Sequence, residues 1–243
     1  MNNNNLRKPV VFITGASRGI GQALVEKFQA ENWLVAACAS QSPPVADLGL
    51  ICDVSDAAQV RTAIAEIIQK LGRLDAVINN AGIAGTNLLD SDASDVLWHR
   101  IIDVNLHGTY YVCKYALAHL PNQSGRIVNI SSVLGLIGTG DATAYSAAKH
   151  AVVGFTKALA KYVAPRQITV NSICPSWVRT EMMAQRMKEM GASEKDLARA
   201  MPLGKIIEPQ EVADFAYYLV AAPGAVNISG QALTMDGGAL VTA

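Results

Sequence analysis

The sequence predicts an α/β protein in which helices cover both faces of a parallel β-sheet. Short apolar stretches rich in β-branched residues alternate with longer stretches at helical spacing, and this alternation runs through the 243 residues. Hydrophobic residues make up 51% of the chain, which suits one large core better than two small ones. We find no internal repeat, linker or membrane-spanning segment, so we expect a single domain across residues 1–243 and no membrane partner.

The overall charge argues against polyanionic partners. The net charge is zero and the pI is near 6.9, so neither nucleic acid nor an anionic membrane is an expected partner. The 4 cysteines lack C-x-x-C spacing and the 4 histidines show no metal-ligand pattern, so we expect free thiols and no metal. Residues 1–8 are polar and lack an apolar signal core, which indicates a flexible tail on a cytoplasmic protein.

The first strand and the first helix enclose a candidate phosphate site. An apolar strand at residues 10–14 runs into the turn GASRGIG at 15–21, and residues 20–32 continue at helical spacing. Glycines let the backbone approach an anion, and the free N–H groups of a helix N-terminus face it. The spacing G-x-x-x-G-x-G is neither the commonest dinucleotide fingerprint nor a P-loop. The turn alone is therefore equally consistent with a plain connection.

The residues after the second strand, at 33–39, bear on which dinucleotide this turn would bind. Sites that select NAD usually place an acid there to hold the ribose 2′-hydroxyl. Here Ser40 and Gln41 follow instead, and the first acid is Asp47. An acid would repel a 2′-phosphate and Arg18 in the first turn would attract one, so the pattern favours NADP(H). The alternative for Arg18 is a solvent-exposed surface arginine.

A short connection leads to the third strand. Too few residues separate the strand at 33–39 from the strand at 48–54 for a crossover helix, so we expect a loop or a single turn. Asp53 comes at the end of the third strand. A helix follows at 55–71, with Ser55 as its expected N-cap.

The fourth strand, at 74–78, ends in a run of small and amide residues. The residues NNAG at 79–82 suit the close approach of a ligand, and they equally suit a simple turn. A long helical region carrying Asn105 is expected at 92–120, and a fifth strand at 126–130.

The stretch from Ile127 to Lys149 carries the candidate chemistry. Its apolar strand meets two hydroxyl groups, at Ser131 and Ser132, and a helix begins near residue 144. Tyr145 and Lys149 lie four positions apart on that helix and share a face. Ser132 precedes Tyr145 by 13 positions, enough for a loop to return over that face. A serine, a tyrosine and a lysine that converge there indicate proton transfer to or from a substrate oxygen.

A second tyrosine–lysine pair shows that this spacing is weak evidence by itself. Tyr110 and Lys114 are also four positions apart, but Leu97 stands 13 positions before Tyr110, where a serine would be required. Their segment is apolar on most faces, so we interpret Tyr110 as a packing residue.

The last part of the chain completes the alternation. We expect a long helix at 144–163, a strand at 167–173, a helix at 209–222 and a strand at 231–235. Residues 180–203 are rich in methionine, lysine, glutamate and alanine and have no partner strand, which is typical of a helical flap over a site.

In sequence order, these motifs resemble those of the short-chain dehydrogenase/reductase family. The matching segments are TGASRGIG at 14–21, Asp53-Val54, NNAG at 79–82, Asn105, Ser132, YSAAK at 145–149 and the turn from Pro175 to Thr180. The resemblance extends to Gly238, and it is greatest to the 3-oxoacyl-[acyl-carrier-protein] reductase-like branch. It implies a Rossmann-type doubly wound sheet of seven parallel strands in the order 3-2-1-4-5-6-7. It also implies a homotetramer, built through the helices at 92–120 and 144–163 and the C-terminal strand region.

The resemblance implies hydride transfer between NADP(H) and a carbonyl or alcohol, with four catalytic residues. Tyr145 would protonate the carbonyl oxygen as hydride arrives, or act as the base in the reverse reaction. Lys149 would lower the pKa of Tyr145 and bind the nicotinamide ribose. Ser132 would hydrogen-bond the substrate oxygen. Asn105 would hold a water molecule that links Lys149 to solvent.

The family pattern also implies where the cofactor lies. The phosphates would lie near the 15–21 turn, the adenine near the end of the third strand and the carboxamide near the 175–180 turn. The implied contacts are Gly15, Ser17, Arg18, Ile20, Gly21, Ser40, Asp53, Val54, Asn79, Ala81, Gly82, Tyr145, Lys149, Pro175, Val178 and Thr180.

The chain departs from the family pattern at three places: the positions that would contact the carboxamide, the positions that would contact the 2′-phosphate, and the carrier-docking site. Ser176 replaces the glycine that follows proline in the family. The connection after the second strand is shorter than in the family, which affects whether Ser40 can reach a 2′-phosphate. In acyl-carrier reductases, basic residues before the fifth strand dock the acidic carrier. Asn122 and Gln123 stand there in this chain, although Arg166 falls where a second basic contact is expected. We expect a small-molecule carbonyl or acyl thioester substrate, and carrier docking stays open.

Two other functions stay open at this point. Oxidation of a diol or secondary alcohol would use the same residues in reverse. A protein that senses NADP(H) without turnover would also bind the cofactor, but it would be free to lose Ser132, Tyr145 and Lys149, which are intact.

Overall fold

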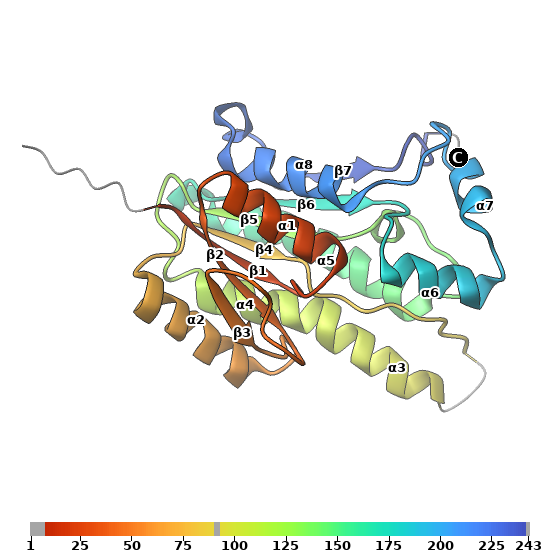
Figure 1. Ribbon diagram of the computed structural model, residues 1–243, viewed down its shortest axis with the longest axis horizontal. Coiled ribbons are helices and arrows are strands. Elements are labelled where there is room, and N and C mark those ends of the chain that lie inside the picture. Colours follow the sequence, from red (N-terminus) through yellow and green to blue (C-terminus); the bar gives the residue numbers. More distant parts are fainter. Residues whose placement is uncertain (1–7, 90–92, 242–243) are drawn as a thin grey trace, which may run out of the picture.

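Parallel strands in the order β3-β2-β1-β4-β5-β6-β7 form the centre of the computed structural model, which describes residues 8–89 and 93–241 (Figure 1). This is the seven-stranded, Rossmann-type order that the resemblance implied, so the predicted fold is confirmed. The strands are β1 (Val10–Thr14), β2 (Leu34–Ala39), β3 (Leu48–Ile51), β4 (Ala76–Asn79), β5 (Arg126–Ile130), β6 (Thr169–Pro175) and β7 (Ala232–Met235).

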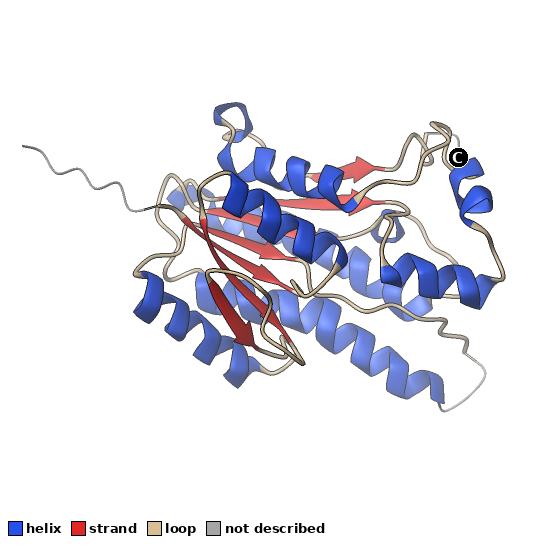
Figure 2. Cartoon of the chain, in the orientation of Figure 1, coloured by secondary structure: helices blue, strands red, loops and turns tan. Residues whose placement is uncertain are grey.

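Helices cover the sheet on both faces, as Figures 1 and 2 show. The helices are α1 (Gly19–Ala30), α2 (Ala57–Leu71), α3 (Ala93–Ile102), α4 (Gly108–Ala116), α5 (Thr143–Val163), α6 (Glu181–Met190), α7 (Glu194–Arg199) and α8 (Pro209–Ala221). Helices α1 and α8 lie on one face, while α2, α4 and α5 lie on the other. The predicted two-sided covering is therefore present.

The central strand β1 shows why the sheet is buried on both faces. All five of its residues are buried, and it pairs in parallel with β2 on one side and β4 on the other. Because strand side chains alternate in direction, Val11 and Ile13 pack in the core that contains Phe28 of α1. Val10 and Phe12 pack in the opposite core, against α2. A continuous apolar sequence is what such a strand requires.

The long helical region predicted at 92–120 is divided in the structure. Residue 92 lies outside the described residues, and α3 gives way at Asp103–His107 to a π-helical turn before α4 begins. Helix α4 ends at Ala116, ahead of Pro121, which cannot continue a helix. The break lies at Asn105, and π-helical turns inside α-helices frequently mark functional sites.

Some predicted boundaries were wrong, each for a local reason. Ser55 does not cap α2, because its hydroxyl is engaged with Asp53 Oδ1 at 2.7 Å. Asp56 is the cap, accepting from two backbone N–H groups. Strand β6 does not begin at Gln167, whose φ of 55° is left-handed and not extended. No helix joins β2 to β3, as predicted from the short connection.

The structure describes the predicted flap at 180–203 but only the last residue of the predicted tail at 1–8. Of the tail at residues 1–8, only Lys8 falls within the described residues. The segment 180–203 folds as α6 and α7 at the end of the sheet where the strands terminate (Figure 1). Across residues 8–89 and 93–241, every helix is too short or too polar to cross a bilayer.

Candidate active site

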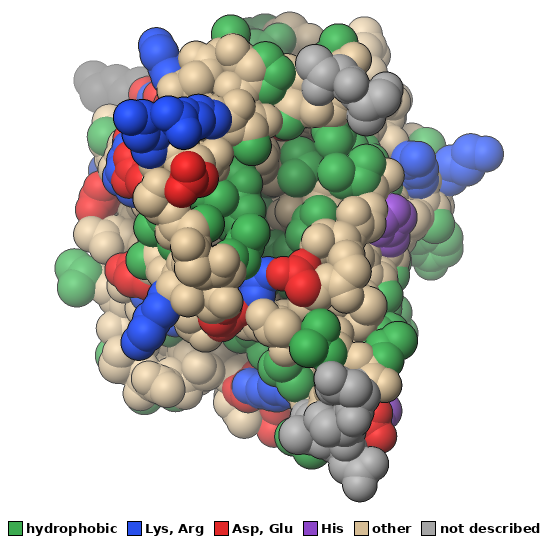
Figure 3. Space-filling view, turned by 90° about the vertical axis from the view of Figure 1, so that its right-hand side faces the viewer, with side chains coloured by type: hydrophobic (Ala, Val, Ile, Leu, Met, Phe, Trp, Pro, Cys, Tyr) green, Lys and Arg blue, Asp and Glu red, His purple; other side chains and the backbone are tan. Residues whose placement is uncertain are grey.

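A cleft of about 850 Å³ opens at the C-terminal ends of the strands. Its walls come from residues that follow β1 to β6 and from the inner side of α6. Figure 3 shows it as a hollow with hydrophobic side chains on both sides. A smaller hollow of about 420 Å³, between Lys8 and the end of α2, contains none of the predicted site residues.

The structure brings nearly all the predicted site residues to this cleft. The cofactor contacts implied by the resemblance line it, with the exception of Asn79. Of the catalytic set, Ser132, Tyr145 and Lys149 line it as well. Asn105 lies directly behind the lining, as described below. The carboxyl ends of an open parallel sheet are where ligands of this fold class bind, so the geometry agrees with the sequence pattern.

The glycine turn after β1 is built for close backbone approach. Gly15 has a φ of 64°, and a Cβ added there would lie 2.6 Å from the Cα of Ala81. Asn80 braces the same turn, because its amide donates to the carbonyls of Thr14 at 3.0 Å and Gly15 at 2.9 Å. The first residues of α1, Gly19 to Gly21, line the cleft and have no side-chain cap, which suits a pyrophosphate group.

Asn79, predicted to contact a ribose, is directed away from the cleft. It is 4% exposed, and its amide donates to Asn129 Oδ1 at 2.8 Å inside the sheet. Asn129 in turn donates to Thr156 on α5 at 2.8 Å. The cleft position belongs instead to Asn80, which is part of the NNAG motif but was not among the predicted cofactor contacts. Successive side chains of an extended segment point in opposite directions, so two adjacent asparagines have different roles.

The adenosine end of the cleft has the composition predicted for NADP(H). Ser40 and Gln41 line it, together with Arg18 from the first turn. Asp47 is turned away and accepts from the backbone N–H of Val35 at 2.9 Å. Asp47 therefore does not oppose a 2′-phosphate, and Asp53, an acid that does line the cleft, is paired with Arg100.

Asp53, the predicted adenine contact, is held by a residue from α3. Its Oδ2 atom accepts from Arg100 at 2.8 Å, and its Oδ1 atom accepts from Ser55. Arg100 also donates to the Ser55 hydroxyl at 2.7 Å and lines the cleft. The sequence offered no signal for Arg100, which is 47 positions from Asp53.

Ser132 and Tyr145 form one wall of the cleft. Ser132 ends the loop after β5 and caps a short 3₁₀ turn, accepting from the N–H of Leu134 at 3.1 Å. Burial raises the pKa of Tyr145 to about 12, and a hydrogen bond with Ser132 opposes this effect. Burial is the largest effect on this pKa, and its lowering by Lys149 stays a prediction. Tyr145 is therefore protonated at neutral pH.

Lys149 is buried beside the tyrosine. It is 4% exposed, and its Nζ atom donates to the carbonyl of Ile130 at 2.8 Å. The same atom lies 5.5 Å from the ring centroid of Tyr145. Burial lowers the pKa of Lys149 to about 8, so the side chain is charged at neutral pH and loses its charge at moderately alkaline pH. Ser131 supports this arrangement by donating to the carbonyl of Lys149 at 3.1 Å.

Asn105 holds the segment beyond β4 next to Lys149. Its side chain accepts from the N–H of Ile83 at 2.9 Å and donates to the carbonyl of Ile83 at 2.8 Å. Gly82 lies between the two groups: a Cβ there would lie 2.7 Å from Asn105 Oδ1 and 3.5 Å from Lys149 Nζ. This packing places Asn105 near the lysine without exposing it to the cleft.

The predicted carboxamide turn closes the cleft. Pro175 ends β6, and Val178 and Thr180 line the cleft after it. Ser176, which replaces the family's glycine, donates its N–H to the carbonyl of Met235 at 2.9 Å. Thr180 is the N-cap of α6, accepting from a backbone N–H at 3.3 Å. The turn therefore connects the cofactor end of the cleft to the flap.

The second tyrosine–lysine pair has no place in the cleft. Tyr110 lies outside the lining residues and packs edge-on against Phe155, with ring centroids 6.2 Å apart. It is 42% exposed, so it is less buried than the apolar pattern of its helix suggested. Lys114 lies over its ring at 5.7 Å. The two pairs have the same spacing, and they differ in that only Tyr145 and Lys149 lie at the cleft beside the strand ends.

Comparisons with known proteins agree with this geometry. The family described as enoyl-(acyl carrier protein) reductase matches residues 15–239. Granaticin polyketide synthase putative ketoacyl reductase 1 of Streptomyces violaceoruber is 37% identical over 255 residues, covering 95% of this chain and 93% of that protein. The solved aldohexose dehydrogenase of Thermoplasma acidophilum is 36% identical with a TM-score of 0.90, covering 98% of this chain and 96% of that one. A solved variant of actinorhodin polyketide ketoreductase with NADPH is 32% identical with a TM-score of 0.86, covering 96% of this chain and 97% of that one.

Proposed function

Because the chain belongs to the short-chain dehydrogenase/reductase family, we propose that it is an NADP(H)-dependent oxidoreductase that reduces a carbonyl compound to an alcohol. The observation that carries this proposal is the meeting of Ser132, Tyr145 and Lys149 on one wall of the dinucleotide-sized cleft. The reductive direction is supported by the ketoacyl reductase among the relatives. A protein that only senses NADP(H) would not require these three side chains to lie together.

Each side chain has a task that its environment suits. Bound NADPH would supply the hydride to the carbonyl carbon. Tyr145, whose pKa is raised by burial to about 12, is protonated at neutral pH and donates its proton to the developing alkoxide. Lys149 carries a positive charge at neutral pH and stabilises the phenolate that forms. Ser132 holds the substrate oxygen with its hydroxyl, and Asn105 fixes the segment beside Lys149.

The preference for NADP(H) over NAD(H) depends on the adenosine end of the cleft. Arg18, Ser40 and Gln41 offer a positive charge and hydrogen-bonding groups, and Asp47 is turned away. A solved relative with NADPH supports the same preference. Titration of NADPH and NADH by fluorescence measures it directly, and tighter binding of NADH would contradict it.

We propose a small-molecule carbonyl or acyl thioester substrate that binds without a docked carrier protein. The one basic residue expected at a docking site, Arg166, is occupied within the chain. It donates to Asn122 Oδ1 at 2.8 Å and to the carbonyls of Leu117 and Leu120. Equal kcat/KM for a 3-oxoacyl group on a carrier protein and on a short thioester is expected. A large preference for the carrier-bound form would overturn this part of the proposal.

A second candidate is oxidation of an alcohol or sugar by the same residues. The solved relative with the TM-score of 0.90 is an aldohexose dehydrogenase, which favours this alternative. The two directions are separated by comparing ketones and 3-oxo thioesters with NADPH against diols, secondary alcohols and aldoses with NADP⁺. The faster direction at neutral pH decides between them.

Replacing the proton donor tests the mechanism. Tyr145→Phe keeps the ring and removes the hydroxyl, so we expect carbonyl-dependent NADPH oxidation to fall about a thousandfold. NADPH fluorescence titration should be unchanged, since the phosphate and adenosine contacts remain. Tyr110→Phe is the matched control, because Tyr110 lies outside the cleft. Survival of full activity in Tyr145→Phe would show that the mechanism is wrong.

We also propose that the chain forms a homotetramer through α4, α5 and the region of β7. Support comes from exposed aromatic side chains on both of these helices, because Tyr110 on α4 is 42% exposed and Tyr162 on α5 is 75% exposed. Light scattering should give four times the chain mass of 25.7 kDa. A monomer at micromolar concentration would contradict this.

A further inference from the structure

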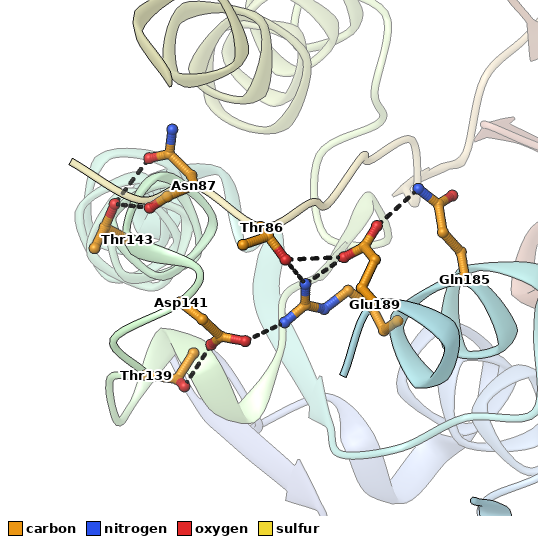
Figure 4. A network of polar contacts seen from close by, with 8 residues as sticks. Thr86, Asn87, Thr139, Asp141, Thr143, Gln185 and Glu189 are labelled. Carbon is orange, nitrogen blue, oxygen red and sulfur yellow. Dashed lines mark hydrogen bonds and ion pairs between the residues drawn. The ribbon is translucent and has the colours of Figure 1, made fainter. Parts of the chain in front are cut away.

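A buried arginine on α6 joins the flap to the body of the protein. Arg186 is only 8% exposed. One guanidinium nitrogen donates to Thr86 Oγ1 at 2.6 Å and to Glu189, and another donates to Asp141 Oδ2 at 2.6 Å. Figure 4 shows the side chains of Thr86, Asp141 and Glu189 converging on this group.

The two loops that Arg186 contacts are already joined to each other. The N–H of Asn87 donates to the carbonyl of Asp141 at 2.9 Å, and Thr143 Oγ1 donates to Asn87 Oδ1 at 2.8 Å (Figure 4). Within the part of the chain that the structure describes, hydrogen bonds from α6 to these loops run through Arg186 and Glu189. The ion pair with Asp141 is therefore the one that ties α6 to the segment leading into α5.

The charges in this cluster depend on one another. Burial alone would lower the pKa of Arg186, but hydrogen bonds with Glu189 and Asp141 outweigh burial and raise it. A hydrogen bond from Thr139, together with those from Arg186, holds the pKa of Asp141 below its usual value despite burial. When one partner of such a pair is removed, the other charge is left poorly solvated. Loss of either partner should therefore release α6 from the loops.

The cluster borders the place where the substrate would bind. Arg186 and Asp141 line the same cleft as Tyr145, and Asp141 precedes Tyr145 by four positions. Helix α6 also contributes the side chains of Met182 and Met183 to the cleft wall. Methionine side chains adapt to different ligand shapes, but the wall they form is only as fixed as the helix that carries them.

We propose that Arg186 is a positioning residue for the carbonyl substrate, and that its contacts with Thr86 and Asp141 fix the methionine wall of α6 opposite Tyr145. The inference rests on the proposed function, because it places the substrate between α6 and Tyr145. Arg186 acts through α6 and does not need to touch the substrate. The adenosine end of the cleft lies away from this cluster, at Ser40, so cofactor binding should depend little on it.

Substitutions of the arginine should separate substrate binding from chemistry. In Arg186→Met, which keeps the length of the side chain and removes its charge, we expect KM for the carbonyl substrate to rise about tenfold. The kcat value and the dissociation constant for NADPH should each change less than about threefold. Asp141→Asn should reproduce the rise in KM. Arg186→Lys keeps the charge but lacks the planar guanidinium group. Its KM should therefore lie between that of the unchanged protein and that of Arg186→Met.

Arg199→Met is the matched control. Arg199 lies on α7, its side chain is 68% exposed, and its ion pair with Asp196 is long, at 3.9 Å. Hydrogen exchange of the α6 amides provides a readout that needs no activity. Exchange at residues 181–190 should be faster in Arg186→Met than in Arg199→Met and the unchanged protein.

The two readouts distinguish failure of this inference from failure of the proposed function. If the unchanged protein reduces no carbonyl compound, the proposed function is wrong, and the exchange rates still decide whether Arg186 holds α6. Unchanged exchange in Arg186→Met would overturn the inference whatever the activity. Faster exchange with an unchanged KM would also overturn it, because α6 would then move without affecting the substrate. An equal rise in KM in Arg199→Met would reduce Arg186 to a general structural role.

Discussion

The buried charge of Lys149 should be measurable as a dependence of stability on pH. Its pKa is lowered by burial from 10.5 to about 8, whereas the unfolded chain retains the value of an exposed lysine. Between these values the unfolded state binds more protons, so stability rises with pH. The penalty for burying the charged lysine is fully present below pH 8 and is relieved as the pH rises through that value. The shift corresponds to about 3 kcal/mol of unfolding free energy at pH 7.

The matched comparison is the unchanged protein against Lys149→Met at two pH values. At pH 9.5 the penalty has fallen to about 1 kcal/mol, so the unchanged protein should gain about 2 kcal/mol relative to the variant between pH 7 and pH 9.5. Urea unfolding at one protein concentration gives both free energies. Loss of the hydrogen bond to Ile130 adds the same offset at both pH values and cancels from the difference.

Lys157→Met supplies the control, because Lys157 lies exposed on the same helix. Its stability difference from the unchanged protein should be the same at both pH values. The reasoning is refuted if the Lys149→Met difference is also constant to within about 0.5 kcal/mol, since Lys149 would then be no costlier to charge in the fold than in solution.

Three further substitutions test other parts of the cleft. In Gly82→Ala the new Cβ would lie 2.7 Å from Asn105 Oδ1. We therefore expect the free energy of unfolding in urea to fall by about 1–3 kcal/mol and kcat to fall as well. An unchanged urea midpoint would count against the close packing. Arg18→Ala should weaken NADPH binding about tenfold in fluorescence titrations and leave NADH binding unaltered, and a parallel loss for both would remove the 2′-phosphate argument. Ser132→Ala should lower kcat about a hundredfold with NADPH affinity retained, and a kcat within twofold of the unchanged protein would exclude its role at the substrate oxygen.

The strands could be predicted from the sequence because burial on both faces requires a continuous run of apolar residues, and the helix that carries Tyr145 and Lys149 because of its helical spacing. Every residue of β1 is buried, so its apolar run can be recognised without knowing its neighbours. Tyr145 and Lys149 share a face through helical geometry alone. The start of β6 was predicted less well. Gln167 has a left-handed φ, and the pattern of apolar residues does not indicate backbone conformation at a single polar position.

Contacts between distant segments could not be read in the same way. Arg186 meets Asp141 and Thr86 across 45 and 100 positions, and no periodicity connects such residues. The effect of burial on the pKa of Tyr145 could not be predicted from the sequence for a related reason. Proximity to Lys149 was implied by the family pattern, whereas the depth of burial depends on how α5 packs against the sheet.

The same burial affects the resting charge states of the two side chains in the proposed reaction. A phenol with a pKa near 12 retains its proton at neutral pH, and an ammonium with a pKa near 8 retains its charge there. The pair therefore rests in the state that a reduction requires, with an acid ready to donate and a cation beside it to stabilise the phenolate. Oxidation would require the opposite state of Tyr145, and burial disfavours that state.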